Sequence, residues 1–117
     1  LRVRNLVDAV RTRWPDYPVA LHLHDTRGLG IANAMAGLEL GVSRFDCSVG
    51  GMGGCPFAGN KAAAGNIATE ELVMLCERMG IETGIDLVKL IDAAVLAESI
   101  VGHSLPGKLF KSGLFNS

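Results

Sequence analysis

Apolar and polar residues follow two different periods along this chain, and each change of period marks the border of a predicted element. From Leu1 to Trp14 the apolar residues recur every three or four positions, the spacing of a helix, and Pro15 follows. Between Tyr17 and Asp25 the period falls to two. This alternation predicts a strand with valine and leucine on one face and histidine on the other.

The same two periods return in the middle of the chain. Residues 28–41 predict a helix that ends at Gly41, because glycine is favoured just after a helix end. The apolar residues expected on one face of this helix are Ile31, Met35 and Leu38. Residues 42–49 alternate again and predict a second strand, and residues 63–67 favour a short third one.

Two further helices are expected toward the C-terminus. The segment 66–80 has helical spacing and is closed by Gly80. The segment 85–102 has Asp86 as an N-cap and Gly102 just after its end. The tail that follows has little periodicity, so neither a helix nor a strand is predicted there.

Helices and strands that alternate with short connections are typical of parallel βα units. The chain has 117 residues and no initiator methionine, whereas a complete (β/α)8 barrel takes about 250 residues. Parallel strands need cover on both faces, and two or three of them cannot close a barrel. We therefore expect an α/β fold in which residues 1–117 are the C-terminal part of a single TIM-barrel domain, with the upstream strands absent.

Composition and charge reduce the number of function classes that this chain could belong to. Apolar residues make up 49% of the chain and charged residues 20%, as in globular proteins. A formal net charge of −1 gives no electrostatic case for nucleic acid or an anionic membrane, and no apolar run approaches the roughly 20 residues of a membrane span. The three cysteines form no close pair, which favours free thiols in a reducing compartment such as the cytoplasm or the mitochondrial matrix.

The sequence LHLHD carries the first candidate for chemistry. His22 and His24 are expected to leave one face of the strand roughly 6.6 Å apart, at the end where a barrel builds its site. Two imidazoles so placed can converge on one cation. The alternative is a pair of histidines hydrogen-bonded on a polar strand face, which is the commoner outcome for an isolated HxH motif. Asp25 can either orient a histidine or cap the next helix.

Asn66 is the second candidate. Asparagine just before a helix is a common N-cap, and that structural role is the strong alternative. Its functional interpretation is an amide oxygen that binds a hard cation. Two imidazoles with oxygen ligands and open positions suit an octahedral Mg²⁺ or Mn²⁺ better than a closed zinc site.

A run rich in glycine is the third candidate, and it leads directly into Cys55. Its glycines are Gly50, Gly51, Gly53 and Gly54. Glycine lets the backbone approach a ligand and lets a loop hinge over a site, and a thiol on such a loop can act as an acid, base or nucleophile. The alternative is a flexible turn with an incidental cysteine. Cys47 and Cys76 fall on apolar faces and are assigned to packing.

Taken together, LHLHDTRGLGIANAMAGLELGVSRFDCSVGGMGGCPFAG and GNIATEEL closely resemble the 3-hydroxy-3-methylglutaryl-CoA lyase family. That family belongs to a larger group of metal-dependent barrel lyases and synthases. The resemblance runs from about Val19 to Gly84. HxHDT and GN are shared with relatives that run Claisen-type condensations, whereas SVGGMGGCPFA is more specific to the lyases.

The resemblance implies roles for individual residues. His22, His24 and Asn66 match the family's ligands for a divalent metal, Mg²⁺ or Mn²⁺. Cys55 matches the catalytic cysteine of a flexible glycine loop that contributes to the substrate pocket, and Glu70 matches an acidic residue implicated in activity. An acyl-CoA substrate is implied, with no nucleic-acid or membrane partner, and a homo-oligomer is left open.

The implied reaction cleaves 3-hydroxy-3-methylglutaryl-CoA into acetoacetate and acetyl-CoA by a retro-Claisen step, with Cys55 as the acid that protonates the product enolate. Two departures keep alternatives open. The family's first-strand Arg–Asp pair is absent from this chain, and the spacing from Cys55 to Asn66 is longer than usual. The alternatives are a related lyase or aldolase acting on another 3-hydroxyacyl-CoA or a 2-oxo acid, and a non-catalytic truncated barrel fragment acting as an interaction module.

Overall fold

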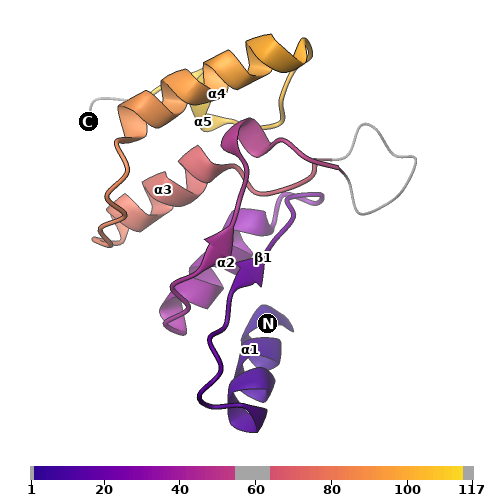
Figure 1. Cartoon of the computed structure of the whole chain (residues 1–117), viewed down its shortest axis with the longest axis vertical. Helices are drawn as coiled ribbons and strands as arrows, with labels where there is room; N and C mark the ends of the chain where they lie inside the picture. The colour runs from indigo at the N-terminus through magenta and orange to yellow at the C-terminus, as the bar shows by residue number, and fades with distance from the viewer. Residues whose placement is uncertain (1, 55–63, 115–117) are drawn as a thin grey trace.

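The structure is a computed structural model that describes residues 2–54 and 64–114 (Figure 1). Its elements, in chain order, are α1 (Arg2–Arg13), β1 (Leu21–His22), α2 (Gly30–Glu39), β2 (Phe45–Asp46), the 3₁₀ turn η1 (Val49–Gly51), α3 (Thr69–Arg78), α4 (Leu87–Val101) and α5 (Leu109–Ser112). This order confirms the four long helices and the two main strands predicted from the sequence. The short helix α5 was not predicted, because its buried Leu109 and Phe110 form no periodic pattern.

The strands β1 and β2 are parallel, as the βα order predicts. Leu21 lies opposite Phe45, and His22 lies opposite Asp46. Both strands are shorter than the alternating segments in the sequence. Within the described residues the sheet has two strands, so most of the alternating positions have no neighbouring strand to pair with.

Among the described residues, the segment of the predicted third strand makes two isolated bridges. One joins Ser48 and Ala68 in parallel, and the other joins His24 and Asn66 in antiparallel fashion. The segment around Asn66 therefore crosses the carboxyl end of β1 and then runs beside the end of β2. This crossing brings the second candidate residue next to the first.

The main core lies between the sheet and the helices α2 and α3. Its buried members are Ala34, Ile67, Leu72 and Cys76, and the residues packed against them are Leu23, Ile31, Leu38, Phe45 and Cys47. The packing roles of Cys47 and Cys76 are confirmed, and both thiols are free. Of the three apolar residues expected on one face of α2, Ile31 and Leu38 pack against this core, whereas Met35 is 43% exposed. Helix α2 turns Gly37 inward instead, since a Cβ there would lie 2.5 Å from a methyl carbon of Leu21.

Helix α4 begins and ends where the sequence predicts. The Asp86 carboxylate accepts a hydrogen bond from the Lys89 N–H at 3.2 Å, and Gly102 ends the helix with φ of 74°. Figure 1 shows α4 and α5 together beyond α3, with the turn η1 beneath them. The C-terminal segment therefore packs against the glycine-rich turn. No helix in the described ranges 2–54 and 64–114 is long and apolar enough to cross a membrane.

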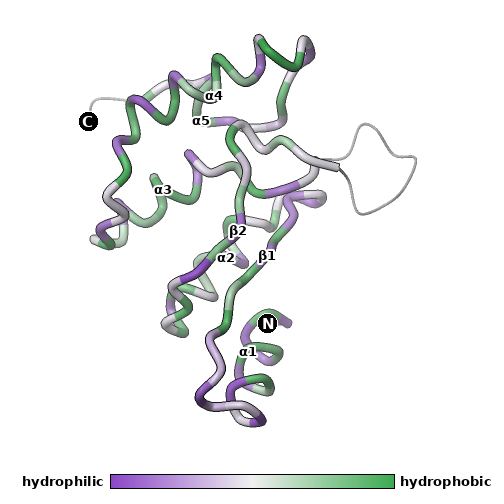
Figure 2. The backbone as a smooth tube through the Cα atoms, viewed as in Figure 1, coloured by the Kyte–Doolittle hydropathy of each residue, from purple (hydrophilic) through white to green (hydrophobic). Residues whose placement is uncertain are grey.

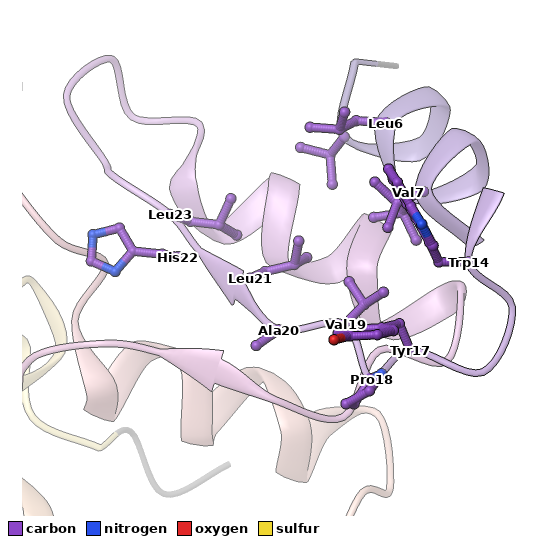
Figure 3. A pocket seen from close by; sticks show the side chains of 12 residues that line it. Leu6, Val7, Trp14, Tyr17, Pro18, Val19, Ala20, Leu21, His22 and Leu23 are labelled. Atoms are coloured by element: carbon purple, nitrogen blue, oxygen red, sulfur yellow. The ribbon is translucent and has the colours of Figure 1, made fainter. Parts of the chain in front are cut away.

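An apolar groove of about 660 Å³ lies between α1 and the segment that leads into β1. In Figure 2 the chain changes from hydrophobic to hydrophilic as it leaves β1. Figure 3 shows His22 directed away from the apolar side chains of the groove, such as Val7 and Trp14. The predicted division of the strand into a leucine face and a histidine face is therefore confirmed.

Candidate metal centre

His22 and His24 converge at the carboxyl end of β1. Their Nε2 atoms lie 3.1 Å apart, and their ring planes are inclined at 52°. Two nitrogens bound to one cation at about 2.1 Å, on neighbouring corners of an octahedron, would be separated by about 3.0 Å. The spacing of the two nitrogens fits joint binding of one cation, as well as a direct hydrogen bond between the rings.

Asp46 supports His22 from the neighbouring strand. The register places Asp46 directly opposite His22, and its Oδ2 lies 3.5 Å from His22 Nδ1. A carboxylate at Nδ1 favours the tautomer that leaves the Nε2 lone pair free for a cation. The sequence analysis missed Asp46, although alternation on the second predicted strand places it on one face with Arg44 and Ser48.

Asp25 caps the next helix. Its Oδ1 accepts a hydrogen bond from the Gly30 N–H at 2.8 Å, at the first turn of α2. Its Oδ2 lies 3.1 Å from Lys108 Nζ. Of the two roles left open for Asp25, the structure therefore shows the capping one.

Asn66 is not the N-cap of the helix that follows it. That position belongs to Ala68, which makes no side-chain cap hydrogen bond. The bridge between His24 and Asn66 is flanked by the hydrogen bonds from Asp25 N to Gly65 O at 2.8 Å and from Ile67 N to Leu23 O at 3.1 Å. In an antiparallel pair of this kind the two opposed side chains leave the same face close together.

The amide of Asn66 is fixed at one end and free at the other. Its Nδ2 donates a hydrogen bond to Met52 O at 3.0 Å. Its Oδ1 is buried and has no hydrogen-bond partner within the described part of the chain, and the same is true of His24 Nδ1. A buried acceptor without a partner costs about 1–3 kcal/mol, so a cation bound at Oδ1 would satisfy an otherwise costly atom.

These donors fit a hard divalent cation. The set contains two imidazole nitrogens from His22 and His24 and one amide oxygen from Asn66. Among the described residues there is no group of three His, Cys, Asp or Glu side chains that could hold a metal, so a site here depends on the amide. One oxygen and two nitrogens with further positions open suit Mg²⁺ or Mn²⁺.

The first half of the glycine run is an anchored turn. Gly50 and Gly51 are buried and adopt φ of 65° and 72°, values that favour glycine. The Gly50 N–H donates to Glu70 Oε2 at 3.0 Å, and Gly50 O accepts from Gly107 N at 2.9 Å. Gly50 is thus held on both sides in this conformation, and the hinge expected from the glycine run stays a prediction.

Gly53 serves a close approach within the protein. A Cβ on Gly53 would lie 2.3 Å from Asn66 Nδ2, so a side chain there would collide with the amide. Gly54, by contrast, has open space around it. The predicted contact of the glycine run with substrate stays a prediction, and Cys55 itself lies outside the described residues.

Glu70 is fully buried on the first turn of α3. Its exposed fraction is 0%, and its Oε1 has no hydrogen-bond partner in the described ranges. Burial raises the pKa of the Glu70 carboxyl, and hydrogen bonds from its own backbone and from Gly50 oppose that rise. Its carboxylate lies between the glycine turn and Gly107 of the C-terminal segment, and its predicted catalytic role stays a prediction.

Lys108 joins the C-terminal segment to the end of β1. Its Nζ lies 3.1 Å from Asp25 Oδ2 and 4.0 Å from Glu71 Oε2, while its backbone N–H donates to Glu71 Oε1. The hydrogen bond to Asp25 raises the pKa of Lys108, and the Glu71 charge adds to the rise. Sequence patterns missed Lys108 and Glu71, because both contacts join residues far apart in the chain.

A family model described as HMGL-like matches residues 1–97. The chain belongs to the HMGL-like family. This confirms the resemblance drawn from the LHLHD, SVGGMGGCPFA and GNIATEEL motifs. The family is one of TIM-barrel proteins, and the described residues show a small parallel sheet with helices from such a fold.

Curated relatives of the HMGL-like chain include two kinds of lyase. Hydroxymethylglutaryl-CoA lyase YngG of Bacillus subtilis is 42% identical over 95% of this chain and 38% of its own length. The (R)-citramalyl-CoA lyase of Chloroflexus aurantiacus is 46% identical over 96% of this chain and 35% of its own length. The chain thus spans a little over a third of the length of these relatives.

Solved structures agree with this assignment. The HMG-CoA lyase of Bacillus subtilis superimposes with a TM-score of 0.86 at 41% identity, covering 94% of this chain and 36% of that one. An HMG-CoA lyase from Acinetobacter baumannii, solved in complex with coenzyme A and 3-methylmalate, gives a TM-score of 0.85 at 44% identity, covering 99% and 37%.

Proposed function

We propose that the protein carrying this chain is an acyl-CoA lyase that cleaves 3-hydroxy-3-methylglutaryl-CoA into acetoacetate and acetyl-CoA. The observation that carries the proposal is the convergence of His22 Nε2 and His24 Nε2, together with the bridge from His24 to Asn66, whose Oδ1 is buried without a partner in the described part of the chain. Membership of the HMGL-like family and similarity to hydroxymethylglutaryl-CoA lyases support it. The free thiols of Cys47 and Cys76 are consistent with a reducing compartment, the cytoplasm or the mitochondrial matrix.

In this proposal His22, His24 and Asn66 hold a divalent cation, Mg²⁺ or Mn²⁺. When bound, it supplies a Lewis acid that stabilises negative charge on a substrate oxygen. The residues of this chain have separate tasks. Asp46 orients the His22 ring, Met52 O orients the Asn66 amide, and the fixed ligands need little rearrangement on binding.

The proton transfer is assigned to Cys55. Cleavage of the bond between carbons 2 and 3 of the acyl group leaves the electron pair on carbon 2, which becomes the methyl carbon of acetyl-CoA. The Cys55 thiol would deliver a proton to that carbon and prevent the reverse condensation. The base that takes the proton from the tertiary hydroxyl would come from the part of the barrel outside residues 1–117, which we propose are the C-terminal portion of one barrel domain.

A related lyase reaction is the second candidate. It is favoured by the 46% identity to a citramalyl-CoA lyase and by the long segment between Cys55 and Asn66. Both acyl groups carry a tertiary hydroxyl beside a methyl group, so the same ligands and the same acid serve either one. The two candidates differ in the length of the acyl chain that the pocket must accept.

A substrate comparison tests the proposal. The full-length protein is assayed with Mg²⁺ on 3-hydroxy-3-methylglutaryl-CoA and on citramalyl-CoA, and kcat/KM is compared. We expect the larger value on 3-hydroxy-3-methylglutaryl-CoA. A larger value on citramalyl-CoA would establish the second candidate, and cleavage of neither would favour the non-catalytic interaction module.

A further inference from the structure

Glu70 contacts backbone that leads to the candidate metal centre. Its side chain is fully buried, and Oε2 accepts the Gly50 N–H at 3.0 Å. On the other side of the carboxyl, a Cβ placed on Gly107 would lie 2.7 Å from Oε1. Glu70 is therefore enclosed between the glycine turn and the C-terminal segment, and its hydrogen bond to Gly50 fixes the turn.

The glycine turn also fixes the position of the Met52 backbone. Gly51 N donates to Ser48 O at 3.0 Å, and Met52 N donates to Val49 O at 3.2 Å. The Gly50 N–H donates a hydrogen bond to Glu70, and the Gly50 carbonyl accepts one from Gly107 N at 2.9 Å. Because both the N–H and the carbonyl of Gly50 are held, the position of the Met52 carbonyl is set by the turn.

The Met52 carbonyl then fixes the Asn66 amide. Asn66 Nδ2 donates to Met52 O at 3.0 Å, which decides which end of the amide is left to act as an acceptor. Gly53 provides the space in which the amide makes this hydrogen bond, because a Cβ there would be 2.3 Å from Nδ2. Contacts thus run from Glu70 through Gly50 and Met52 to the Oδ1 of Asn66.

We propose that Glu70 is a positioning residue that holds Asn66 in its cation-binding orientation through the Gly50 turn and the Met52 carbonyl. This inference rests on the cation site of the proposed function. It assigns to Glu70 a task different from proton exchange with substrate. An acceptor oxygen suffices for that task, whereas acid or base chemistry needs a carboxyl group.

The test compares Glu70→Gln with Glu70→Ala in the full-length protein, with Mn²⁺ affinity measured by calorimetry. Glutamine keeps an oxygen that can accept from Gly50 N, so its affinity should stay within about threefold of wild type and its turnover should be retained. Alanine removes the acceptor, and affinity should fall roughly 10–100-fold, as for other residues that orient metal ligands. Glu77→Ala, an exposed site on the same helix, is the control and should leave affinity unchanged.

Gly53→Ala perturbs the contacts from the opposite end and should lower Mn²⁺ affinity without touching Glu70. It also keeps the test decisive if Glu70→Ala fails to fold. A turnover loss of roughly 10²–10⁴-fold in Glu70→Gln with unchanged Mn²⁺ affinity would overturn the proposal in favour of acid–base catalysis. Unchanged affinity in His24→Ala would refute the cation site itself, whereas weakened affinity in His24→Ala together with normal affinity in Glu70→Ala would refute only the positioning role.

Discussion

The two ends of the described structure are stabilised in different ways. Around the candidate metal centre, buried polar groups are held by hydrogen bonds between distant segments, as between Gly50 and Glu70 and between Gly50 and Gly107. Around α1, one side of the helix faces an apolar groove, and many side chains face solvent. The polar contacts of this helix include those of Arg4 with Glu39 and of Arg11 with the Leu40 carbonyl. Glu70 is 0% exposed, whereas Trp14 is 54% and Tyr17 is 73% exposed.

The groove beside α1 shows the difference most clearly (Figure 3). It is lined mainly by apolar side chains, and Leu6 on its rim is 65% exposed. Hydrogen bonds specify a geometry within the chain, whereas an apolar face without cover gains stability only when something packs on it. The comparison shows that hydrogen bonds within the chain fix the geometry of the site end. The α1 end, by contrast, needs other protein surfaces to cover its apolar side chains.

The largest expected effect is a loss of turnover at the site end without a loss of stability. In the full-length protein, Cys55→Ser replaces the thiol with a much weaker acid of similar shape. Turnover should fall roughly 10²–10⁴-fold, while Mn²⁺ affinity and Tm barely change. Steady-state kinetics and calorimetry check this, and near-normal turnover would move the catalytic acid to another part of the barrel.

The next effect concerns the ligands themselves. His22→Ala or His24→Ala in the full-length protein should weaken Mn²⁺ binding by at least tenfold, since each removes a nitrogen that faces the other. His103→Ala is the matched control, because His103 is exposed and its ring forms a hydrogen bond with the neighbouring Ser104 carbonyl. Calorimetry measures the affinity, and equal affinity in all three variants would make the His22–His24 pair structural.

A third experiment addresses the α1 end. The 117-residue chain alone should self-associate through its apolar groove, as measured by sedimentation velocity. Replacing Leu6 and Trp14 together by serine should weaken that association roughly tenfold or more, because each change removes apolar area that is buried on contact. Asn5→Ser on the exposed side of α1 is the control. A monodisperse, cooperatively melting wild-type chain would contradict the dependence on neighbours.

The smallest effect is a pH dependence at the site end. Burial raises the pKa of Glu70 above its ordinary 4.5, so the folded protein holds this proton to a higher pH than the unfolded chain does. The free energy of unfolding should therefore fall as pH rises from 4.5 through the raised pKa, with a slope of at most about 1.4 kcal/mol per pH unit. Glu70→Gln should remove this slope in urea titrations. An identical slope in the variant would mean that another group titrates.

Local signals explain which parts of the fold could be predicted. Helix α4 follows from its periodicity, its Asp86 N-cap and Gly102, all of which act within a few residues. The apolar spacing of α2 does not show that Gly37, which lies close to Leu21, is on the inner side of the helix while Met35 is exposed. Periodicity shows which positions of a helix share an apolar face. It does not show how much space a strand from a distant part of the sequence leaves beside that face.

The site divides in the same way. The spacing of His22 and His24 on one strand predicts their convergence, because it depends only on the pleat. The sequence could not decide between a cap and a ligand for Asn66, since that depends on where α3 begins. Asp46 and Lys108 reach the site only through pairing with residues far away in the chain.

The contact between Gly50 and Gly107 also sets an order of events during synthesis. Gly107 leaves the ribosome long after the histidines, the glycine turn and Asn66, yet its N–H completes the support of that turn. A nascent chain that ends before Gly107 carries every proposed ligand but lacks one of the two hydrogen bonds that hold Gly50. The cation site should therefore mature late in translation, when the C-terminal segment docks.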